Sequence, residues 1–197
     1  MAKGSTGMEY VLIISNSEKG AALISELLNP AYVCQIIAVK TCGEARRLLL
    51  ERDFDLVIID APLKDETGES LALHAASREM TQVILIVRRE FFEAVSAVCE
   101  KEGILTIEKP VNRYIFMSAL SLARSVYNRM KKIQTENAQL RKRIEDIRIV
   151  DRAKCILISL MSMSEKEAHR YIEKQAMDMR ITKRAVAERI LKTYEDL

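Results

Sequence analysis

The chain has few residues suited to binding a metal ion or to forming disulfides. Its 197 residues include two histidines, and its four cysteines show no CxxC spacing. This pattern argues against a zinc site and a disulfide framework, and it favours reduced structural cysteines. No apolar run reaches the roughly 18 residues of a membrane-spanning helix, and the N-terminus lacks the apolar region of a signal peptide. We therefore expect a cytoplasmic protein with no membrane segment.

The net charge of +3 conceals an asymmetry between two halves of the chain. Residues 1–112 contain 12 Lys and Arg against 17 Asp and Glu, whereas residues 113–197 contain 19 against 11. The first part is acidic and the second is basic. A basic half indicates a nucleic-acid partner, or a long solvated helix that is rich in lysine and arginine. Charge alone does not separate these two interpretations.

Short β-branched apolar runs alternate with helical patterns in the acidic half. Such runs are typical of buried parallel strands. They predict an α/β fold with a five-stranded parallel sheet and helices on both faces. Residues 1–8 are small and polar and are expected to form a disordered leader. The expected strands are Tyr10–Ile14, Val33–Val39, Leu56–Ile59, Val83–Val87 and Ile104–Ile107.

The ends of these predicted strands carry a recognisable pair of residues. Asp60 directly follows the third strand, and Lys109 follows the fifth and precedes Pro110. In open parallel sheets, functional side chains gather just beyond the strand C-termini. Residues 9–125 resemble the receiver domain of bacterial response regulators, which has a flavodoxin-like fold. The resemblance implies that Asp60 holds the phosphoacceptor position and that Lys109 pairs with it.

Other receiver positions depart from the family pattern. The family holds Mg²⁺ with an acidic pair after the first strand and reads the phosphoryl group with a Ser or Thr after the fourth strand. Here Ser15 and Asn16 replace the acidic pair, and Val87 replaces the hydroxyl residue. Neutral oxygens do not offset the charge of Mg²⁺, which prefers carboxylates. We expect a degenerate receiver domain without ordinary Mg²⁺-dependent phosphotransfer and without a bound cofactor. Arg88 is a candidate substitute partner for a phosphoryl or carboxylate group.

A continuous helical pattern without proline or glycine runs from Tyr114 to about Met161. Within it, alternating steps of four and three residues form a stripe of three heptads that is apolar except for one asparagine, as in a coiled coil. This stripe predicts a homodimer seam, with parallel pairing favoured and antiparallel pairing left open. The alternative is a single helix packed on its own domain. The seam residues are Val126, Met130, Ile133, Asn137, Leu140, Ile144 and Ile147.

Three helices are expected from residue 148 to the C-terminus. Ser164 and Glu167 have the spacing of a capping box, and Thr182 fits the N-cap of the last helix. Residues 148–191 resemble the ANTAR domain of transcription antitermination regulators. The matching segments are Ala153-Lys154-Cys155, Ser164-Glu165-Lys166-Glu167-Ala168, Tyr171, Gln175–Arg180 and Ala185-Val186-Ala187. The expected organisation is a leader over residues 1–8, a receiver-like domain over 9–122, a coiled-coil linker over 123–147 and an all-α three-helix ANTAR domain over 148–197.

The ANTAR resemblance implies a dimer that binds tandem hairpins in nascent leader RNA and prevents a terminator from forming. Aromatic rings and guanidinium groups can stack on loop bases, and basic side chains can bind phosphates. For Tyr171 the competing interpretation is a core residue. For the cations it is a solvated helix face. The RNA-binding candidates are Arg152, Lys154, Arg170, Tyr171, Lys174, Arg180, Lys183 and Arg184.

No nucleophile–base pair or phosphate-binding loop is present in the sequence, so we do not expect an enzyme. Two other functions are consistent with parts of the chain. The receiver resemblance alone suggests a DNA-binding response regulator, with Ile181-Thr182 as a short joint between helices. A protein-interaction module without nucleic acid is the third possibility. The receiver half is expected to respond to a regulatory protein, a small ligand or phosphorylation.

Overall fold

The computed structural model of the chain describes residues 8–28, 33 and 35–194. The expected leader over residues 1–8 therefore falls outside this part of the chain except for Met8. Met8 is only 3% exposed and packs in an apolar core, so it is not part of a disordered segment. Within the described residues, no helix combines the length and the apolar character needed to cross a membrane.

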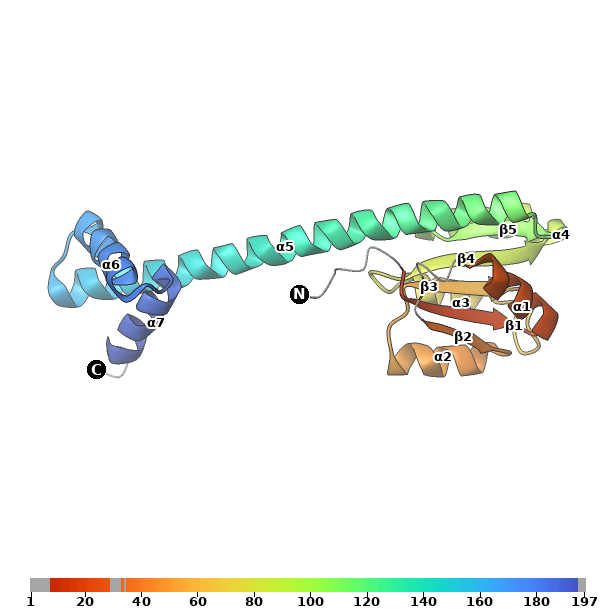
Figure 1. Cartoon of the computed structure of the whole chain (residues 1–197), viewed down its shortest axis with the longest axis horizontal. Coiled ribbons are helices and arrows are strands. Elements are labelled where there is room, and N and C mark those ends of the chain that lie inside the picture. The colour runs from red at the N-terminus through yellow and green to blue at the C-terminus, as the bar shows by residue number, and fades with distance from the viewer. Residues whose placement is uncertain (1–7, 29–32, 34, 195–197) are drawn as a thin grey trace. The chain divides into compact units, whose positions relative to one another are not determined.

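Five parallel strands form one sheet in the order β2-β1-β3-β4-β5 (Figure 1). Every neighbouring pair is parallel, which confirms the predicted flavodoxin-like α/β fold. β1 and β3 lie next to each other in a register that places Ser15 beside Asp60. The strands are β1 (Tyr10–Ser15), β2 (Gln35–Val39), β3 (Leu56–Asp60), β4 (Gln82–Arg88) and β5 (Leu105–Lys109).

Helices connect successive strands, and three more follow the sheet. The long helical pattern without proline or glycine forms a single helix, α5. The connecting helices are α1 (Glu18–Leu27), α2 (Cys42–Glu51), α3 (Glu69–Ala76) and α4 (Arg89–Cys99), which continues into a short 3₁₀ turn, Glu100–Glu102. The later helices are α5 (Arg113–Met161), α6 (Glu165–Met179) and α7 (Lys183–Tyr194).

Alternate residues of the strands supply two apolar cores, one on each face of the sheet. Leu12 and Ile14 pack with residues of α2, α3 and α4. Val11 and Ile13 pack with residues of α1 and with Phe116 of α5. Successive side chains of a strand point to opposite faces. A sheet covered on both faces therefore requires the continuous apolar runs that the sequence shows.

The chain divides into two compact units, Met1–Lys132 and Ile133–Leu197, and α5 contributes to both. Ala123 and Tyr127 belong to the expected linker, yet both are buried in the core that α1 and α5 form on the sheet. The Tyr127 hydroxyl also donates a hydrogen bond of 2.7 Å to Asp55 Oδ1. Asp55 Oδ2 in turn accepts from the backbone N–H of Glu9 and of Tyr10. The first turns of the expected linker are thus fastened to the sheet.

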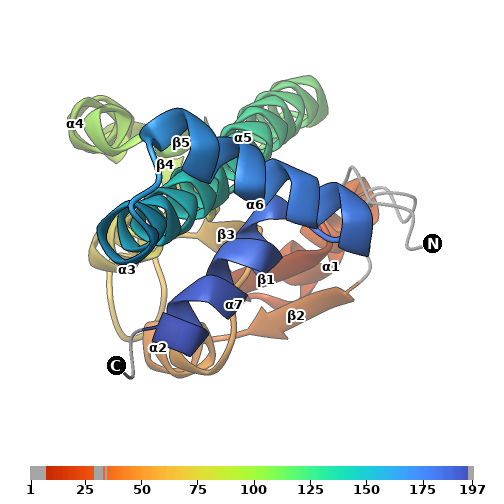
Figure 2. The same ribbon diagram turned by 90° about the vertical axis from the view of Figure 1, so that its left-hand side faces the viewer.

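In the second unit, α6 and α7 pack against the last turns of α5 (Figures 1 and 2). Small and branched residues let the three helices approach closely, among them Ala153, Ala168 and Ala187, all fully buried. The predicted capping box is present: Glu167 N–H donates to Ser164 Oγ at 3.3 Å, and Ser164 N–H donates to the Glu167 carboxylate at 2.8 Å. These contacts fix where α6 begins.

Candidate functional site

Asp60 lies at the C-terminal end of β3, and both of its carboxylate oxygens have a partner. Lys109 Nζ at the end of β5 is 2.6 Å from Asp60 Oδ1. The Ser15 hydroxyl donates to Asp60 Oδ2 at 2.6 Å. Asp60 is 9% exposed and Ser15 is 2% exposed. The predicted pairing of Asp60 with Lys109 is therefore what the structure shows, with Ser15 as a third member.

The surroundings of this carboxylate are tightly packed. A Cβ atom added to Gly20 in α1 would lie 2.8 Å from Asp60 Oδ2 and 3.0 Å from Ser15 Oγ. Both distances are shorter than ordinary van der Waals contact, so glycine is needed at this approach of α1 to β3. Lys109 Nζ also donates to the backbone oxygen of Ala61 at 2.5 Å. The ammonium group is thereby held between two oxygen acceptors.

The residues at the positions of the acidic pair and of the hydroxyl residue make contacts with other parts of the receiver unit. Asn16 Nδ2 donates to the backbone oxygen of Pro62, and Val87 is buried in the apolar core. Arg88 is exposed, and its guanidinium lies 3.6 Å from Glu90. Glu18, which is the acidic residue nearest to Ser15 and Asn16 along the chain, forms an ion pair with Lys40.

This donor set does not fit Mg²⁺. The site offers one carboxylate, already occupied by an ammonium group, and a serine hydroxyl, whereas the cation needs several charged or water oxygens in an octahedron. Among the described residues that surround Asp60, the contacts instead form a closed network of short hydrogen bonds. The network connects the C-terminal ends of β1, β3 and β5.

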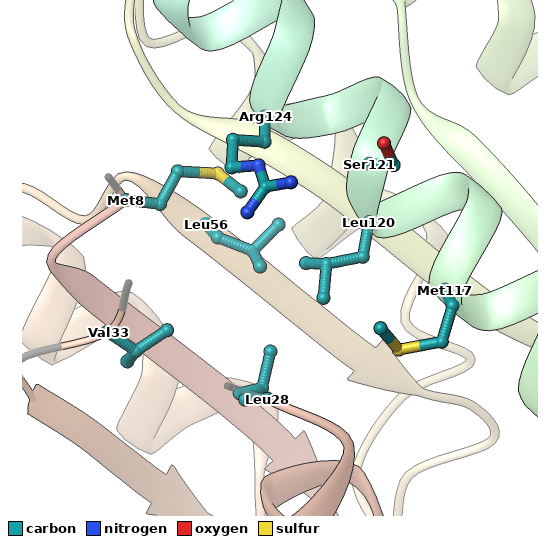
Figure 3. A pocket seen from close by; sticks show the side chains of 8 residues that line it. All are labelled: Met8, Leu28, Val33, Leu56, Met117, Leu120, Ser121 and Arg124. Atoms are coloured by element: carbon teal, nitrogen blue, oxygen red, sulfur yellow. The ribbon is translucent and has the colours of Figure 1, made fainter. Parts of the chain in front are cut away.

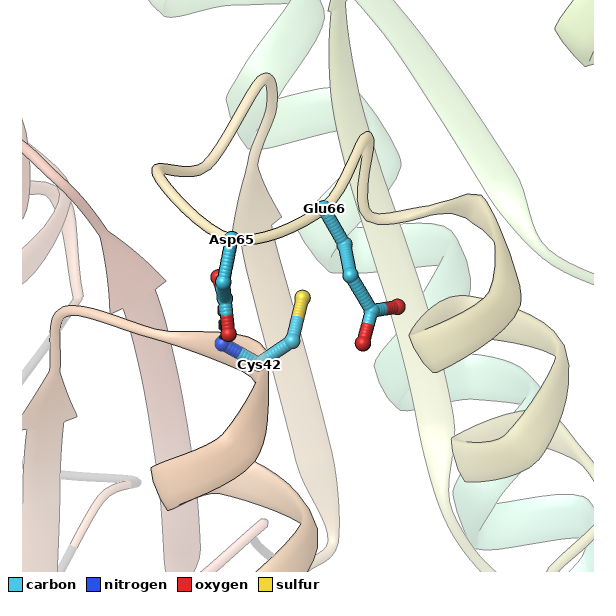
Figure 4. Close-up of side chains that lie close together, drawn as sticks. All are labelled: Cys42, Asp65 and Glu66. Atoms are coloured by element: carbon cyan, nitrogen blue, oxygen red, sulfur yellow. Dashed lines mark hydrogen bonds between the residues drawn. The ribbon is translucent and has the colours of Figure 1, made fainter.

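Cys42, Asp65 and Glu66 form another cluster, with donor atoms within 4.8 Å of one another (Figure 4). Asp65 accepts from the backbone N–H groups of Cys42 and Gly43, each at 3.0 Å, and these bonds lower the pKa of its carboxyl group. A hydrogen-bonded ion pair with Arg46 lowers the pKa of Glu66. Burial raises the pKa of the Cys42 thiol to about 11. The thiol is protonated, and both carboxylates already have hydrogen-bond partners. We therefore interpret the cluster as a contact that fixes the start of α2, and the sequence did not predict it.

The predicted RNA-binding cations separate into two groups in the second unit. Three of them join the helices by ion pairs. Lys154 on α5 contacts Glu165 on α6 at 3.0 Å, and Lys183 on α7 contacts Glu173 on α6 at 2.5 Å. Arg184 on α7 contacts Asp146 on α5 and Glu188 on its own helix, each at 2.7 Å. These three side chains therefore connect all three pairs of helices.

The ion pairs also shift the titration of their members. Hydrogen bonds to Asp151 and Glu165 raise the pKa of Lys154, and those to Asp146 and Glu188 raise the pKa of Arg184. The hydrogen bond from Lys183 lowers the pKa of Glu173, which also lies 3.2 Å from His169. For Lys154, Arg184 and Glu173, these shifts favour the charged form that makes the ion pair.

The second group lies on the outer surface of α6. Arg170 and Lys174 are exposed and four residues apart, and within the described residues neither makes an ion pair. Lys166, one further turn toward the N-terminus, is exposed in the same way; the sequence analysis missed it, although its spacing was visible. Arg180 ends α6 in the left-handed conformation, with φ 54°, and it too is exposed.

Tyr171 and Arg152, the remaining RNA-binding candidates, belong to neither group. Tyr171 is 37% exposed and borders a hollow lined in part by Met179 and Arg189, so its ring is not a core residue. Arg152 is exposed on α5 and borders a different hollow, beside Cys155. Of the predicted RNA-binding side chains, Arg170, Tyr171, Lys174 and Arg180 thus come from α6 and its C-terminus.

The predicted seam of α5 is largely exposed in the single chain. Its apolar members other than Met130 are between 40% and 60% exposed, and Asn137 is also exposed. Met130 is partly buried, and its sulfur accepts a hydrogen bond from Gln82 Nε2 at 3.5 Å. Farther along α5, Ile149, Ala153 and Leu157 pack in the core shared with α6 and α7, whereas Ile158, Leu160 and Met161 are exposed.

Comparison with known proteins assigns both parts of the chain. The first unit has the fold of a signal receiver domain of an HD-domain-containing protein from Pseudomonas fluorescens Pf-5, with a TM-score of 0.55 and 23% identity over 64% of this chain and 93% of that one. The first part of the chain is therefore a receiver-fold domain. Residues 138–191 match the model of the ANTAR domain.

Two relatives join these parts. The transcriptional regulatory protein PdtaR of Mycobacterium tuberculosis is 29% identical over 139 residues, which are 71% of this chain and 68% of the relative. The aliphatic amidase regulator of Pseudomonas aeruginosa is 30% identical over 129 residues, which are 66% of this chain and 62% of the relative. The chain therefore has a receiver-fold domain followed by an ANTAR domain, and it is homologous to these two proteins. Both relatives are named as regulators.

Proposed function

We propose that this protein is an RNA-binding transcription antitermination regulator, acting as a dimer on tandem hairpins of a nascent leader transcript under the control of its atypical receiver domain. The observation that carries the proposal is the exposed stripe of Lys166, Arg170 and Lys174 on α6 of the ANTAR domain, hereafter the α6 stripe. Prevention of terminator formation follows if the bound hairpins exclude the competing terminator structure.

The α6 stripe has the chemistry and spacing of a phosphate-binding surface. Its members are four residues apart, so successive cations lie about 6 Å apart along the helix axis. The stripe makes no ion pair with the described residues, so an RNA phosphate need not displace a carboxylate. Tyr171 adjoins Arg170 with a partly exposed ring, which suits stacking on an unpaired loop base.

The paired cations support a different role. An RNA phosphate at Lys183 or Arg184 would have to compete with a carboxylate at 2.5–2.7 Å. We infer that Lys154, Lys183 and Arg184 mainly hold the three helices in place. They position the α6 stripe, and their contribution to RNA affinity is indirect.

A second copy of this chain is the proposed partner of the α5 seam. The four-and-three steps place Met130, Asn137 and Ile144 at a positions and Val126, Ile133, Leu140 and Ile147 at d positions of a heptad. An asparagine at one a position is a device that fixes register in parallel pairs. Exposed apolar residues at the other positions would be buried by that partner, at about 25 cal/mol for each Å² removed from water.

The RNA proposal is tested with the full chain and a two-hairpin leader RNA, measured over a range of salt concentrations. Replacing Arg170 and Lys174 with glutamine removes two phosphate contacts. The slope of log K against log salt should become shallower by roughly 1.4, at about 0.7 per contact with single-stranded RNA. A matched control, Lys19→Gln with Lys101→Gln, removes the same charge from exposed sites of the receiver unit and should leave the slope unchanged.

Specificity needs a separate measurement. Wild-type protein should bind the two-hairpin RNA more tightly than an RNA with scrambled loops or a DNA duplex of equal length. Equal affinity for the scrambled RNA would refute hairpin recognition. Preference for the duplex would favour a DNA-binding regulator, and no salt-dependent binding of any polyanion would favour a protein-interaction module.

Dimerisation is tested by sedimentation equilibrium. Leu140 is 52% exposed in the single chain, so Leu140→Glu should cost the monomer fold little and place two carboxylates in the seam. The variant should be monomeric where the wild type is dimeric. Lys142→Glu, two residues on at an outward heptad position, is the control and should stay dimeric. Dimers of equal stability in all three proteins would place the interface elsewhere.

A further inference from the structure

A cavity of about 230 Å³ lies in the receiver unit between the sheet and α5 (Figure 3). Its walls come from the segment before β1, the start of β3, the residue after α1, and two turns of α5. The lining is apolar apart from Ser121 and one arginine on α5. The side chains that the argument uses are Met8, Leu28, Leu56, Met117, Leu120 and Arg124.

The cavity is far from the phosphoacceptor position in the fold. Leu56 is the first residue of β3, and Asp60 is the last. Met8 lies two residues before the first residue of β1. The cavity therefore sits at the N-terminal edge of the sheet, whereas Ser15, Asp60 and Lys109 meet at the C-terminal edge. A ligand here would not compete with chemistry at Asp60.

Well-packed protein interiors contain few voids larger than a water molecule. Met8 and Leu28 are each 3% exposed and Leu56 is fully buried, yet all three border this space. Their apolar surfaces lack the contacts that a filled core would provide. A ligand with an apolar body would supply those contacts, so the cavity has the properties of a ligand-binding site.

Arg124 adds a charge to this apolar site. Figure 3 shows its side chain extending from α5 toward Leu56, between Met8 and Leu120. Arg124 is partly buried, and the planar fork of its guanidinium is suited to a carboxylate. An anionic group on the ligand would thus have a cation at the edge of the cavity, with the apolar body against Leu56 and Leu120.

We propose that this cavity binds a small apolar carboxylate, in which the carboxylate contacts Arg124 and a ring or branched chain fills the space between the sheet and α5. The size is suitable: an apolar cavity of about 150 Å³ in another protein binds benzene. The larger volume here accommodates a ring with a carboxyl group. It is below the 300–1,000 Å³ of pockets for drug-sized ligands.

Binding would act on α5 directly. Met117, Leu120 and Arg124 lie on the same helix as Tyr127, whose hydroxyl fastens α5 to Asp55. A ligand that bridges α5 to the sheet stabilises this docking. The seam begins with Val126 and Met130 on the next turn, so a ligand here is placed to influence the seam independently of Asp60. The binding claim itself does not depend on RNA binding.

The test uses the full chain with ¹³C-labelled methionine methyl groups and benzoate as the probe, without RNA. The methyl signals of Met8 and Met117 should shift in a saturable way, whereas those of Met177 and Met179 in the ANTAR unit should not. Benzamide, the neutral analogue, should bind at least about tenfold more weakly, because it lacks the charge-assisted hydrogen bonds. Absence of any benzoate-dependent shift at both pocket methionines would overturn the proposal.

Three variants locate the site. Arg124→Gln should lower benzoate affinity at least about tenfold and leave benzamide affinity unchanged. Arg129→Gln, an exposed arginine on the same helix, is the control and should bind benzoate as the wild type does. Met117→Phe, at a position that is 40% exposed and so tolerant of change, should fill the cavity and abolish the shift at Met8. Unaltered benzoate affinity in Arg124→Gln or in Met117→Phe would refute the proposed site.

Discussion

Removal of the Ser15 hydroxyl tests whether the edge of the receiver is held by a charged hydrogen-bond network. Ser15 Oγ donates to Asp60 Oδ2 at 2.6 Å and accepts from the backbone N–H of Ser17 at 3.2 Å, and it lies 3.1 Å from the backbone oxygen of Ser17. Ser15→Ala deletes all of these contacts. The effect on the free energy of unfolding therefore contains a part due to Asp60 and a part due to Ser17.

The size of the first part follows from the charge and burial of the pair. Hydrogen bonds to charged groups contribute about 1.5–3 kcal/mol, and neutral ones about 0.5–1.5 kcal/mol. Ser15 and Asp60 are 2% and 9% exposed, so solvent does little to weaken the bond. Asp60→Asn keeps an oxygen acceptor but removes the charge. Ser15→Ala should thus cost about 1 kcal/mol more with aspartate at position 60 than with asparagine.

A double-mutant cycle isolates this difference, because the contact to Ser17 is lost equally in both backgrounds. The assay is amide hydrogen exchange of β1 and β3 in the full chain, since it reports the opening of the receiver unit separately from that of the ANTAR unit. Independent sites add within about 0.3–0.5 kcal/mol. A coupling energy below that limit would refute the charged network, whatever the single variants cost.

Three further outcomes are expected. In the folded chain, burial and then the hydrogen bond to Asp55 raise the pKa of Tyr127 and keep it protonated. The wild type should therefore lose stability above about pH 10, where the tyrosine of the unfolded chain ionises. Tyr127→Phe should remove this loss, and equal pH profiles of thermal unfolding for the variant and the wild type would contradict this. Acetyl phosphate with Mg²⁺ should give no stoichiometric mass gain, and a full gain mapped to Asp60 would show that the site is active. Ser164→Ala should destabilise α6 by about 1 kcal/mol, because the cap to Glu167 is lost. Unchanged amide hydrogen exchange in the first turn of α6 would exclude this effect.

Much of the receiver follows from its sequence because local patterns and fold rules agree. Runs such as Leu56–Ile59 are apolar at every position, which only a strand covered on both faces requires. The carboxyl ends of neighbouring parallel strands meet at one edge, so Asp60 and Lys109 had to approach each other once the sheet was recognised. The capping box at Ser164 is similarly local, with both members within one helical turn.

Long-range partners were not predictable in the same way. Arg184 and Arg170 are alike in sequence, yet Arg184 contacts Asp146, 38 residues away along the chain, and Arg170 is exposed without an ion pair among the described residues. The helical pattern reveals which face is apolar but not which carboxylates the packing of three helices brings near a cation. The same limitation concealed the contact of Asp65 with the start of α2.

The two edges of the receiver differ in how directly they reach α5. At the C-terminal edge, Asp60 is enclosed by Ser15 and Lys109, and the donor set does not suit Mg²⁺. At the N-terminal edge, Asp55 holds Tyr127 of α5 through a hydrogen bond of 2.7 Å. A change at Asp60 would reach α5 through Lys109, which lies four residues before that helix begins, whereas a ligand at the N-terminal edge would contact α5 itself. Since α5 is the element that both units share, we infer that a ligand in the N-terminal cavity has the more direct contact with it.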